Sequence, residues 1–381
     1  KFMDYGFMAA MMRSDTLPAR DLWYSAGNIN YYYVGQYYAV FLTKLSFTRI
    51  QETYHLMRTL VAGFAFALPF SLAFHMIKGI PGRAKAVPGW IASLCGLLAG
   101  AAVSLAGNMH YVLYGLFGSV FKLSGYEEYW FPDSTRYIGH NPLNDDQCIH
   151  EFPSYSFVLG DLHAHVVNVM YVLLMIGILY AWMKRVRERE GTEQGFRLKR
   201  ILLEPPVIAV GILTGIFQWT NYWDFVIYTV VVFICIFCVS MYRYGSRLRA
   251  AAAAVAVQTV EVLLLGAAAA LPFTSTFETM VSGVALSQNH SALYQLLILW
   301  GLPAALVLVL LLGICGIGLV LIPELVYVRD IYENGYARSN TMFKLTYQAF
   351  IMFGIAMAYT VVRLLLWKGR KAARAAGAAG L

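Results

Sequence analysis

The residues with the clearest chemical potential are the aspartate and two histidines of the run Asp161-Leu162-His163-Ala164-His165. Carboxylate and imidazole groups bind divalent cations, and an Asp–His pair can also act as a base and its orienting group. The run opens a long apolar segment, where ionisable groups are costly and by default mark a functional site. A role as a helix cap would explain Asp161 but not the two histidines. We predict catalytic roles for all three residues and, because Asp161 and His165 would share a face of a helix starting at Asp161, a metal site at this pair.

Three other groups of polar residues could contribute to a site. Asp4 lies among aromatic and apolar residues ahead of Tyr31–Tyr33, Asp224 follows a tryptophan-rich turn, and a basic stretch lies within Glu324–Gln348. Arginine and lysine in that stretch would offer donors to a phosphate or pyrophosphate. Each group also has an explanation without function. The stretch around Asp4 and the tyrosines could be a solvated loop with an interfacial tyrosine belt, the tryptophans before Asp224 could be ordinary interfacial residues, and the basic stretch could be a loop on the inner leaflet. The predicted substrate-binding residues are Tyr31, Tyr32, Tyr33, Glu151, Asp224, Asp330, Arg338, Asn340 and Lys344.

The composition defines the elements that must position these residues. Hydrophobic residues make up 59% of the chain and charged residues 13%, whereas a soluble domain has about 25% charged residues. The long apolar runs predict helices that cross a bilayer, because only helices and closed barrels satisfy the backbone there. The net charge of +8 sits in short basic runs beside apolar segments, which is typical of cytoplasmic membrane loops and excludes nucleic acid as the expected partner. The five cysteines form no disulfide or zinc framework.

Eight apolar runs of about 20 residues are candidate membrane spans. They are Leu56–Ile77, Gly89–Asn108, Leu162–Met183, Leu202–Trp219, Trp223–Tyr242, Ala250–Pro272, Tyr294–Leu312 and Phe350–Trp367. The basic residues that place their linkers inside are Lys78, Arg83 and Lys85, the run Lys184–Arg200 and the run Arg243–Arg249. We therefore predict an all-α polytopic bundle of about eight spans in the plasma membrane. Its parts would be an extracytoplasmic loop over 1–55, the helix bundle over 56–367 with an outer loop over 109–161, and a basic cytoplasmic tail over 368–381.

Two segments fit this scheme less simply. Tyr31–Phe47 is apolar enough to cross, but its tyrosines suit the headgroup zone, and we expect an interfacial helix there. Tyr294–Ile322 is too long for one crossing and short for two, so we expect Gly313–Ile322 to return as a short or broken helix, with the membrane parity open. The first residues have a loop-like sequence. We expect the chain, which starts at Lys1, to be a fragment that lacks an upstream membrane helix.

Five stretches together resemble one known family. They are KFMDYGFMAAMMRSD, INYYYVGQYY, EFPSYSFVLGDLHAH, TNYWDF and ELVYVRDIYENGYARSNTMFKLTYQ. In this order they resemble the uncharacterised membrane proteins named for a Tyr-Tyr-Tyr motif, the YYY membrane proteins. That family usually has Pro at the position of Phe2, Phe-Gly-His at Val34–Gln36 and Pro at Ala164. Without the histidine, Gln36 is not expected to transfer a proton.

The YYY family in turn looks like a distant relative of the GT-C glycosyltransferases, membrane enzymes that use lipid-phosphate-linked sugars. In that superfamily an acidic residue lies early in the first outer loop, and Asp4 matches this placement. The resemblance implies a role for Asp4. In the hypothesis that we favour, Asp4 is a general base or holds the acceptor, while Asp161, His163 and His165 bind a divalent cation (Mg²⁺ or Mn²⁺) or assist Asp4. Arg338 and Lys344 would stabilise the leaving polyprenyl phosphate. The implied partners are a lipid-linked sugar donor and membrane lipids.

Two other functional classes compete with this transferase hypothesis. A transporter or flippase for a polar lipid or anion would also use intramembrane Asp, His and Arg, although the chain shows no internal repeat. A structural membrane subunit would explain the helices but not the gathering of polar residues into four groups. The chain has no Walker A motif, no G-x-G-x-x-G after a strand, no H-E-x-x-H and no G-x-S-x-G, so cytoplasmic nucleotide chemistry is not expected.

Overall fold

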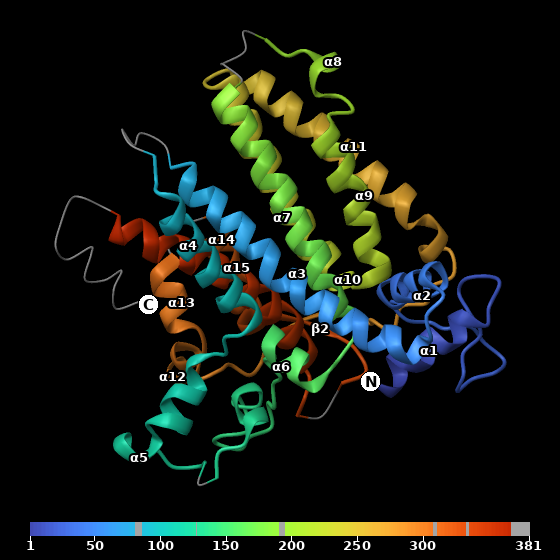
Figure 1. The fold of residues 1–381 in the computed structure, drawn as a ribbon, viewed down its shortest axis with the longest axis vertical. Helices are drawn as coiled ribbons and strands as arrows, with labels where there is room; N and C mark the ends of the chain where they lie inside the picture. The colour runs from blue at the N-terminus through green and yellow to red at the C-terminus, as the bar shows by residue number, and fades with distance from the viewer. Residues whose placement is uncertain (81–85, 127, 190–194, 308–310, 333–334, 367–381) are drawn as a thin grey trace. The chain divides into compact units, whose positions relative to one another are not determined.

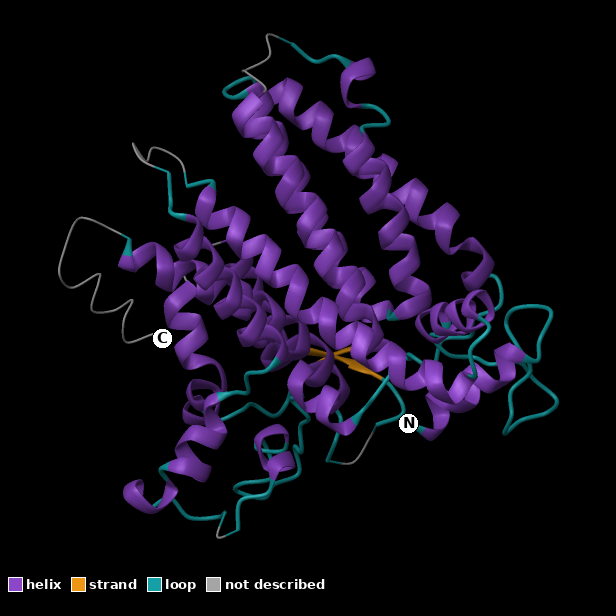
Figure 2. Ribbon diagram, viewed as in Figure 1, coloured by secondary structure: helices purple, strands orange, loops and turns teal. Residues whose placement is uncertain are grey.

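The computed structural model describes residues 1–80, 86–126, 128–189, 195–307, 311–332 and 335–366 (Figure 1). Within these ranges the secondary structure is helical apart from one small sheet of two strands (Figure 2). The chain divides into two compact units. Unit 1 comprises Lys1–Val61 and Gly160–Glu278, and unit 2 comprises Ala62–Leu159 and Thr279–Leu381.

Five of the described helices are long and apolar enough to cross a membrane. They are α3 (Ile50–Lys78), α7 (Ala164–Arg189), α10 (Tyr222–Tyr244), α11 (Leu248–Thr274) and α15 (Ser339–Leu365). At 1.5 Å per residue, a span of the apolar layer needs about 20 residues. Shorter apolar helices are α4 (Gly89–Ser104), α9 (Pro205–Thr220), α14 (Leu311–Leu325), and the run Leu293–Val307. The protein is therefore an all-α, multi-pass integral membrane protein, as the composition predicted.

Unit 1 is built around the helices α7, α9, α10 and α11, which pack against one another. Small residues let α9 and α11 approach closely, since a Cβ added at Gly215 would lie 2.5 Å from the carbonyl oxygen of Gly266. Such close packing of helix backbones replaces the hydrophobic driving force that helices lack in lipid. The shorter helices α1 (Phe2–Met12), α2 (Val34–Ser46) and α8 (Leu198–Ile201) complete the unit.

A buried carboxylate ties these four helices together. Glu204, just before α9, accepts hydrogen bonds from Trp182 of α7 (2.9 Å), Arg243 of α10 (3.2 Å) and Gln258 of α11 (3.2 Å). Arg185 of α7 also pairs with it. A buried charge is tolerated when it is paired and hydrogen-bonded, so this network supports the packing of unit 1.

Unit 2 is centred on α15, which packs against α4 and α14. Its apolar core includes Ala92, Cys95, Ala99, Ala358 and Val362. Strands β1 (Gly283–Leu286) and β2 (Val326–Arg329) pair antiparallel. The short elements of unit 2 are the π-helix η1 (Tyr111–Leu116), α5 (Gly118–Phe121), the 3-10 helix η2 (Phe131–Thr135), α6 (Pro153–Leu159), α12 (Leu293–Leu296), the π-helix η3 (Leu297–Gly301) and α13 (Leu302–Val307).

Each predicted span contains a helix, but several boundaries differ. Phe2–Met12 is the helix α1 and not the loop that its sequence suggested. The last apolar helix starts at Ser339, well before the predicted Phe350, because a polar first turn can extend a helix beyond its apolar stretch. Leu293–Val307 and Leu311–Leu325 are separate helical stretches, so the expected second short helix is present. Tyr31–Phe47 does contain a helix, α2.

Some of the expected basic segments lie outside the described residues. These are the tail 368–381, Arg83 and Lys85, and positions 190–194 of the Lys184–Arg200 run. The orientation in the membrane that these segments implied therefore stays a prediction.

Candidate functional site

Asp4 lies in the first turn of α1 with its side chain fully buried. The Gln36 side chain of α2 donates through Nε2 to Asp4 Oδ1 (3.1 Å) and to the backbone oxygen of Leu162 (3.0 Å). One amide group therefore joins three parts of unit 1: α1, α2 and the loop before α7. Because a buried carboxylate needs donors, Gln36 also stabilises Asp4 in its buried position.

The loop before α7 turns sharply at Gly160, whose φ of +68° is in the left-handed region. Asp161 Oδ1 then accepts from the backbone N–H of His163 (3.3 Å). The carbonyl oxygen of His163 accepts the first helical hydrogen bonds, from Val166 (2.9 Å) and Val167 (3.1 Å). His163 thus caps α7, and both Asp161 and His163 project from the loop and not from the helix.

This helix start corrects one prediction. Asp161 and His165 were expected to share a helix face, but α7 begins at Ala164, because the Asp161 side chain closes a turn with the backbone of His163. His165 lies buried in the first turn of α7, with its ring centroid 6.0 Å from that of His163. The group that the fold brings together is instead Asp4, Asp161 and His163, which we call the Asp–His cluster.

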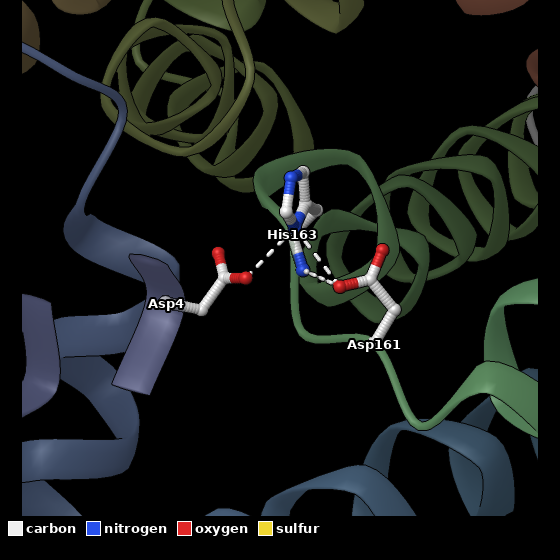
Figure 3. A group of neighbouring side chains, drawn as sticks. All are labelled: Asp4, Asp161 and His163. Carbon is white, nitrogen blue, oxygen red and sulfur yellow. Dashed lines mark hydrogen bonds and ion pairs between the residues drawn. The ribbon is translucent and has the colours of Figure 1, made fainter. Parts of the chain in front are cut away.

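In the Asp–His cluster, the imidazole of His163 lies between two carboxylates (Figure 3). Its Nδ1 is 2.9 Å from Asp161 Oδ1 and 2.7 Å from Asp4 Oδ2. Nδ1 donates to Asp161 Oδ1 and also forms an ion pair with Asp4 Oδ2. The α-amino group of Lys1, which a longer chain would not have, lies 3.3 Å from the same oxygen.

The electrostatics of the cluster favour a charged imidazole. Burial by itself would lower the pKa of His163, but its hydrogen bond to Asp161 and the neighbouring Asp4 carboxylate outweigh burial and raise the pKa to about 9. Burial would raise the pKa of Asp161, yet the hydrogen bond and charge of His163 keep it below its usual range. At neutral pH His163 is therefore an imidazolium beside the carboxylate of Asp161, and an imidazolium has no lone pair with which to accept a proton.

The same three side chains also have the geometry of a cation site. One ligand atom from each lies within 4.8 Å of the other two. Two carboxylate oxygens and one imidazole nitrogen suit Mn²⁺ better than Mg²⁺, because Mg²⁺ prefers an all-oxygen shell. A cation at Nδ1 would replace the proton, so the proton-bound and metal-bound forms exclude each other.

Other predicted residues of unit 1 take part in packing. Tyr31 contacts the ring of Phe7 at 5.5 Å, and Tyr32 and Tyr33 contact Phe273 at 6.4 and 6.0 Å between ring centroids. These tyrosines thus belong to an aromatic cluster that joins α1, α2 and α11. Tyr33 is buried, whereas Tyr31 and Tyr32 are partly exposed and can still contact a substrate.

Asp224 forms a second polar site within unit 1. Its carboxylate is fully buried at the start of α10 and accepts a hydrogen bond from Asn168 Nδ2 of α7 (2.6 Å). Asn168 Oδ1 in turn accepts from Thr220 at the end of α9 (2.7 Å). This chain fixes the ends of three helices against one another.

The remaining predicted residues belong to unit 2. Glu151 pairs with Arg136 at 2.9 Å. Asp330 accepts from Asn340 at 2.7 Å. Lys344 lies over the ring of Phe343, 4.6 Å from its centroid.

Arg338 is held by protein acceptors on every side. Its Nε and Nη2 donate to Asp146 (2.8 and 2.5 Å), its Nη1 to Glu324 (2.8 Å) and the Pro323 oxygen (3.4 Å), and its Nη2 also to Ser291 (3.0 Å). Burial alone would lower the pKa of Arg338, but the Asp146 carboxylate raises it. Because all five N–H groups have acceptors, Arg338 is suited to holding unit 2 together and has no donor left for a phosphate.

Sequence reasoning missed Gln36 as a neighbour of Asp4. The available signal was that the resembled family carries histidine at this position, which marks it as chemically relevant. It also missed Asp146, because the partner of Arg338 is 192 residues away in the sequence. No local spacing encodes either contact.

Comparison with known proteins identifies one family. A family described as "Uncharacterized membrane protein (DUF2298)" matches residues 1–314 and 305–353. A search of curated proteins and a search of solved structures found no match.

Proposed function

The chain belongs to the DUF2298 family of uncharacterised membrane proteins, and we propose that it is a membrane glycosyltransferase of the GT-C kind. It would transfer a sugar from a polyprenyl-phosphate donor on the extracytoplasmic face of the plasma membrane. The observation that carries the proposal is the Asp–His cluster. It gathers an early acidic residue, Asp4, with the Asp161 and His163 of a loop far along the chain, in a family whose description states no reaction.

Asp4 is the general base of the proposed reaction. Its Oδ2 is held 2.7 Å from the charged His163 Nδ1 and, as a carboxylate oxygen, keeps a second lone pair that can accept a proton. The acceptor hydroxyl gives its proton to this oxygen and forms a bond to the anomeric carbon of the donor sugar. The bond from that carbon to the phosphate oxygen breaks, and polyprenyl phosphate leaves with the electron pair. Base catalysis of this kind contributes about 10²- to 10⁴-fold.

His163 and Gln36 position the base. The imidazolium of His163 remains charged at neutral pH because its pKa is about 9, so it cannot take the proton from the acceptor. It holds Asp4 Oδ2 by charge, while Gln36 fixes the other oxygen by a hydrogen bond. Two supports on one carboxylate restrict its rotation, which is what a base aimed at one hydroxyl needs.

A divalent cation is a further component of the proposal. Asp4, Asp161 and His163 would hold it, and Mn²⁺ suits their mixed donor set. When bound, a cation would stabilise negative charge on the phosphate or on the acceptor oxygen. Whether the proton or a cation occupies His163 Nδ1 is measured directly by metal analysis of the purified protein.

A transporter or flippase of a polar lipid is the second candidate. The observation in its favour is that three apolar helices carry an internal proline, namely Pro69 in α3, Pro272 in α11 and Pro323 in α14. A proline removes one hydrogen bond from the helical ladder and weakens the helix there, and weakened or interrupted helices commonly line transport pathways. This candidate differs from the first in giving no covalent product.

The test is sugar transfer by the purified protein from a panel of polyprenyl-phosphate-linked sugars. We expect Asp4→Asn to lower the rate at least 100-fold, because the amide has no basic oxygen. The matched control is Asp15→Asn, an exposed aspartate in the loop after α1, which should keep the wild-type rate. Equal rates for Asp4→Asn and wild type would contradict the proposal. Movement of the lipid across vesicles without any glycosylated product would support the transporter instead.

A further inference from the structure

Arg58 lies beside the Asp–His cluster but takes no part in it. It projects from the third turn of α3 and packs on the backbone of Gly160, the residue before Asp161. A Cβ built at Gly160 would lie 2.1 Å from Arg58 Nη2 and 2.3 Å from Cζ, so a side chain here would push the guanidinium out of its present place. Tyr54, one turn earlier in α3, donates to the Gly160 oxygen (3.4 Å) and fixes the same contact.

The guanidinium of Arg58 has unused donors. Its one side-chain hydrogen bond in the described residues joins Nη1 to His55 Nδ1 (3.0 Å), and it makes no ion pair there. Its Nε is buried and has no hydrogen-bond partner in the part of the chain that the structure describes. A buried N–H of a permanent cation is costly when unpaired, which indicates that a ligand supplies the missing acceptor.

We propose that Arg58 binds a phosphate oxyanion, the charged group of the lipid-linked substrate, next to the Asp–His cluster. This proposal rests on the function proposed above. Two carboxylates repel an incoming phosphate, so a donor of that kind needs a cation close to the cluster but not neutralised by it. Arg58 is placed at that point, and the planar fork of arginine matches two phosphate oxygens at once.

The surroundings of Arg58 favour a phosphate carried by a lipid. Arg58 lies in α3, which is long and apolar enough to span the membrane. An isoprenoid chain could therefore lie along the lipid-facing surface of α3 while its phosphate reaches Arg58. A free phosphate would use the guanidinium in the same way but would gain nothing from this apolar surface.

The experiment measures equilibrium binding of radiolabelled decaprenyl phosphate to the full chain in phosphatidylcholine nanodiscs. We expect Arg58→Ala to weaken binding at least tenfold and Arg58→Lys to weaken it less, because lysine keeps the charge but not the fork. Arg49→Ala is the matched control, since Arg49 is an exposed arginine directly before the same helix. It should bind like the wild type. Uncharged decaprenol should bind equally to the wild type and to Arg58→Ala.

Inorganic phosphate then identifies the source of the anion. If inorganic phosphate displaces the labelled lipid only at concentrations far above that of the lipid, the bound anion is the lipid headgroup. If inorganic phosphate competes as strongly as unlabelled decaprenyl phosphate does, the site binds free phosphate. An unchanged affinity in Arg58→Ala, or equal affinity of the wild type for decaprenol and decaprenyl phosphate, would overturn the proposal. Binding of the lipid does not require sugar transfer. If Arg58→Ala lost binding in a protein that transfers no sugar, this result would support the phosphate site at Arg58 and contradict only the proposed transferase activity.

Discussion

His163 has two carboxylate neighbours and one Nδ1 proton, and this imbalance defines the chemistry of the site. The proton goes to Asp161, and Asp4 keeps an oxygen that only charge constrains. The result is an ordered base with a free lone pair beside a fixed positive charge. A histidine of ordinary pKa would instead be mostly neutral above pH 7, and Asp4 and Asp161 would repel each other.

The raised pKa of His163 predicts a pH dependence of stability. The pKa is about 9 in the fold against 6.5 for a free histidine, so the ion pairs stabilise the fold fully below pH 6.5, and this contribution disappears as the pH rises through 9. We expect the Tm of the wild type to fall between pH 6.5 and 9. The Tm of His163→Gln should fall less over the same range, because this variant has no imidazolium to lose. The control His290→Gln replaces an exposed histidine and should keep the wild-type pH profile. Parallel profiles for wild type and His163→Gln would refute the ion pairs.

Residue types and the family resemblance together identified Asp4, Asp161 and His163, but not the contacts between them. Asp161 and His163 stood out because ionisable groups are rare beside an apolar run, and Asp4 stood out through family resemblance. Gln36 and Arg58 could not be found in this way, since their significance comes from neighbours 32 and 102 positions away, Asp4 and Gly160. Contacts over such distances are set by helix packing, which no local pattern encodes.

At the scale of elements, the turn at Gly160 positions the site. Its left-handed φ of +68° ends the loop so that Asp161 can close its hydrogen bond to His163 and α7 can begin at Ala164. The absence of a side chain also admits the guanidinium of Arg58. The turn thus orders the acidic cluster and the nearby cation together.

Gly160→Ala is expected to damage both functions of this turn. The left-handed backbone costs a residue with a Cβ about 1–2 kcal/mol, and Arg58, the flexible partner, must move away. We expect lower thermal stability and weaker binding of decaprenyl phosphate. Gly177→Ala is the control, because Gly177 lies within α7 and an added Cβ would have no atom of the described residues within 4 Å, so stability should stay equal or rise. Equal behaviour of the two variants would show that the turn does not depend on glycine.

The long helices were predictable, whereas the short ones were not. Apolar runs that match the bilayer thickness indicate helices because no other open structure satisfies the backbone in lipid. The helix α1 has 11 residues, too few for an apolar run that matches the bilayer, so its sequence lacks that signal. The start of α7 was misjudged by three residues, because the side chain of Asp161 competes with the helix for the N–H of His163.

On the scale of the whole molecule, each unit has its own buried ion network. Glu204 joins the helices of unit 1, and Arg338 joins Asp146 and Glu324 in unit 2. Sequence reasoning assigned Arg338 to a phosphate because a basic residue near a membrane helix suits that role. Its complete set of protein acceptors favours a structural role, which a single sequence cannot show.

Arg338→Gln is therefore expected to destabilise unit 2. Removal of the cation leaves Asp146 and Glu324 as buried, unpaired carboxylates, and breaking a buried pair costs about 3–5 kcal/mol. Unfolding in detergent, followed by circular dichroism, measures the loss. Arg329→Gln removes an exposed arginine and should change stability by less than about 0.5 kcal/mol. A fully stable Arg338→Gln that has lost only lipid-phosphate binding would restore the phosphate role.

All of the proposed chemistry requires that Asp4 of α1 meets His163 before α7. The most direct measurement is cross-linking of Asp4→Cys with His163→Cys in native membranes by a short bifunctional thiol reagent, with mass spectrometry of the linked peptides. We predict a link between these two positions and none for the control pair Asp15→Cys with His163→Cys. Two reactive thiols that form no link between positions 4 and 163 would contradict the site.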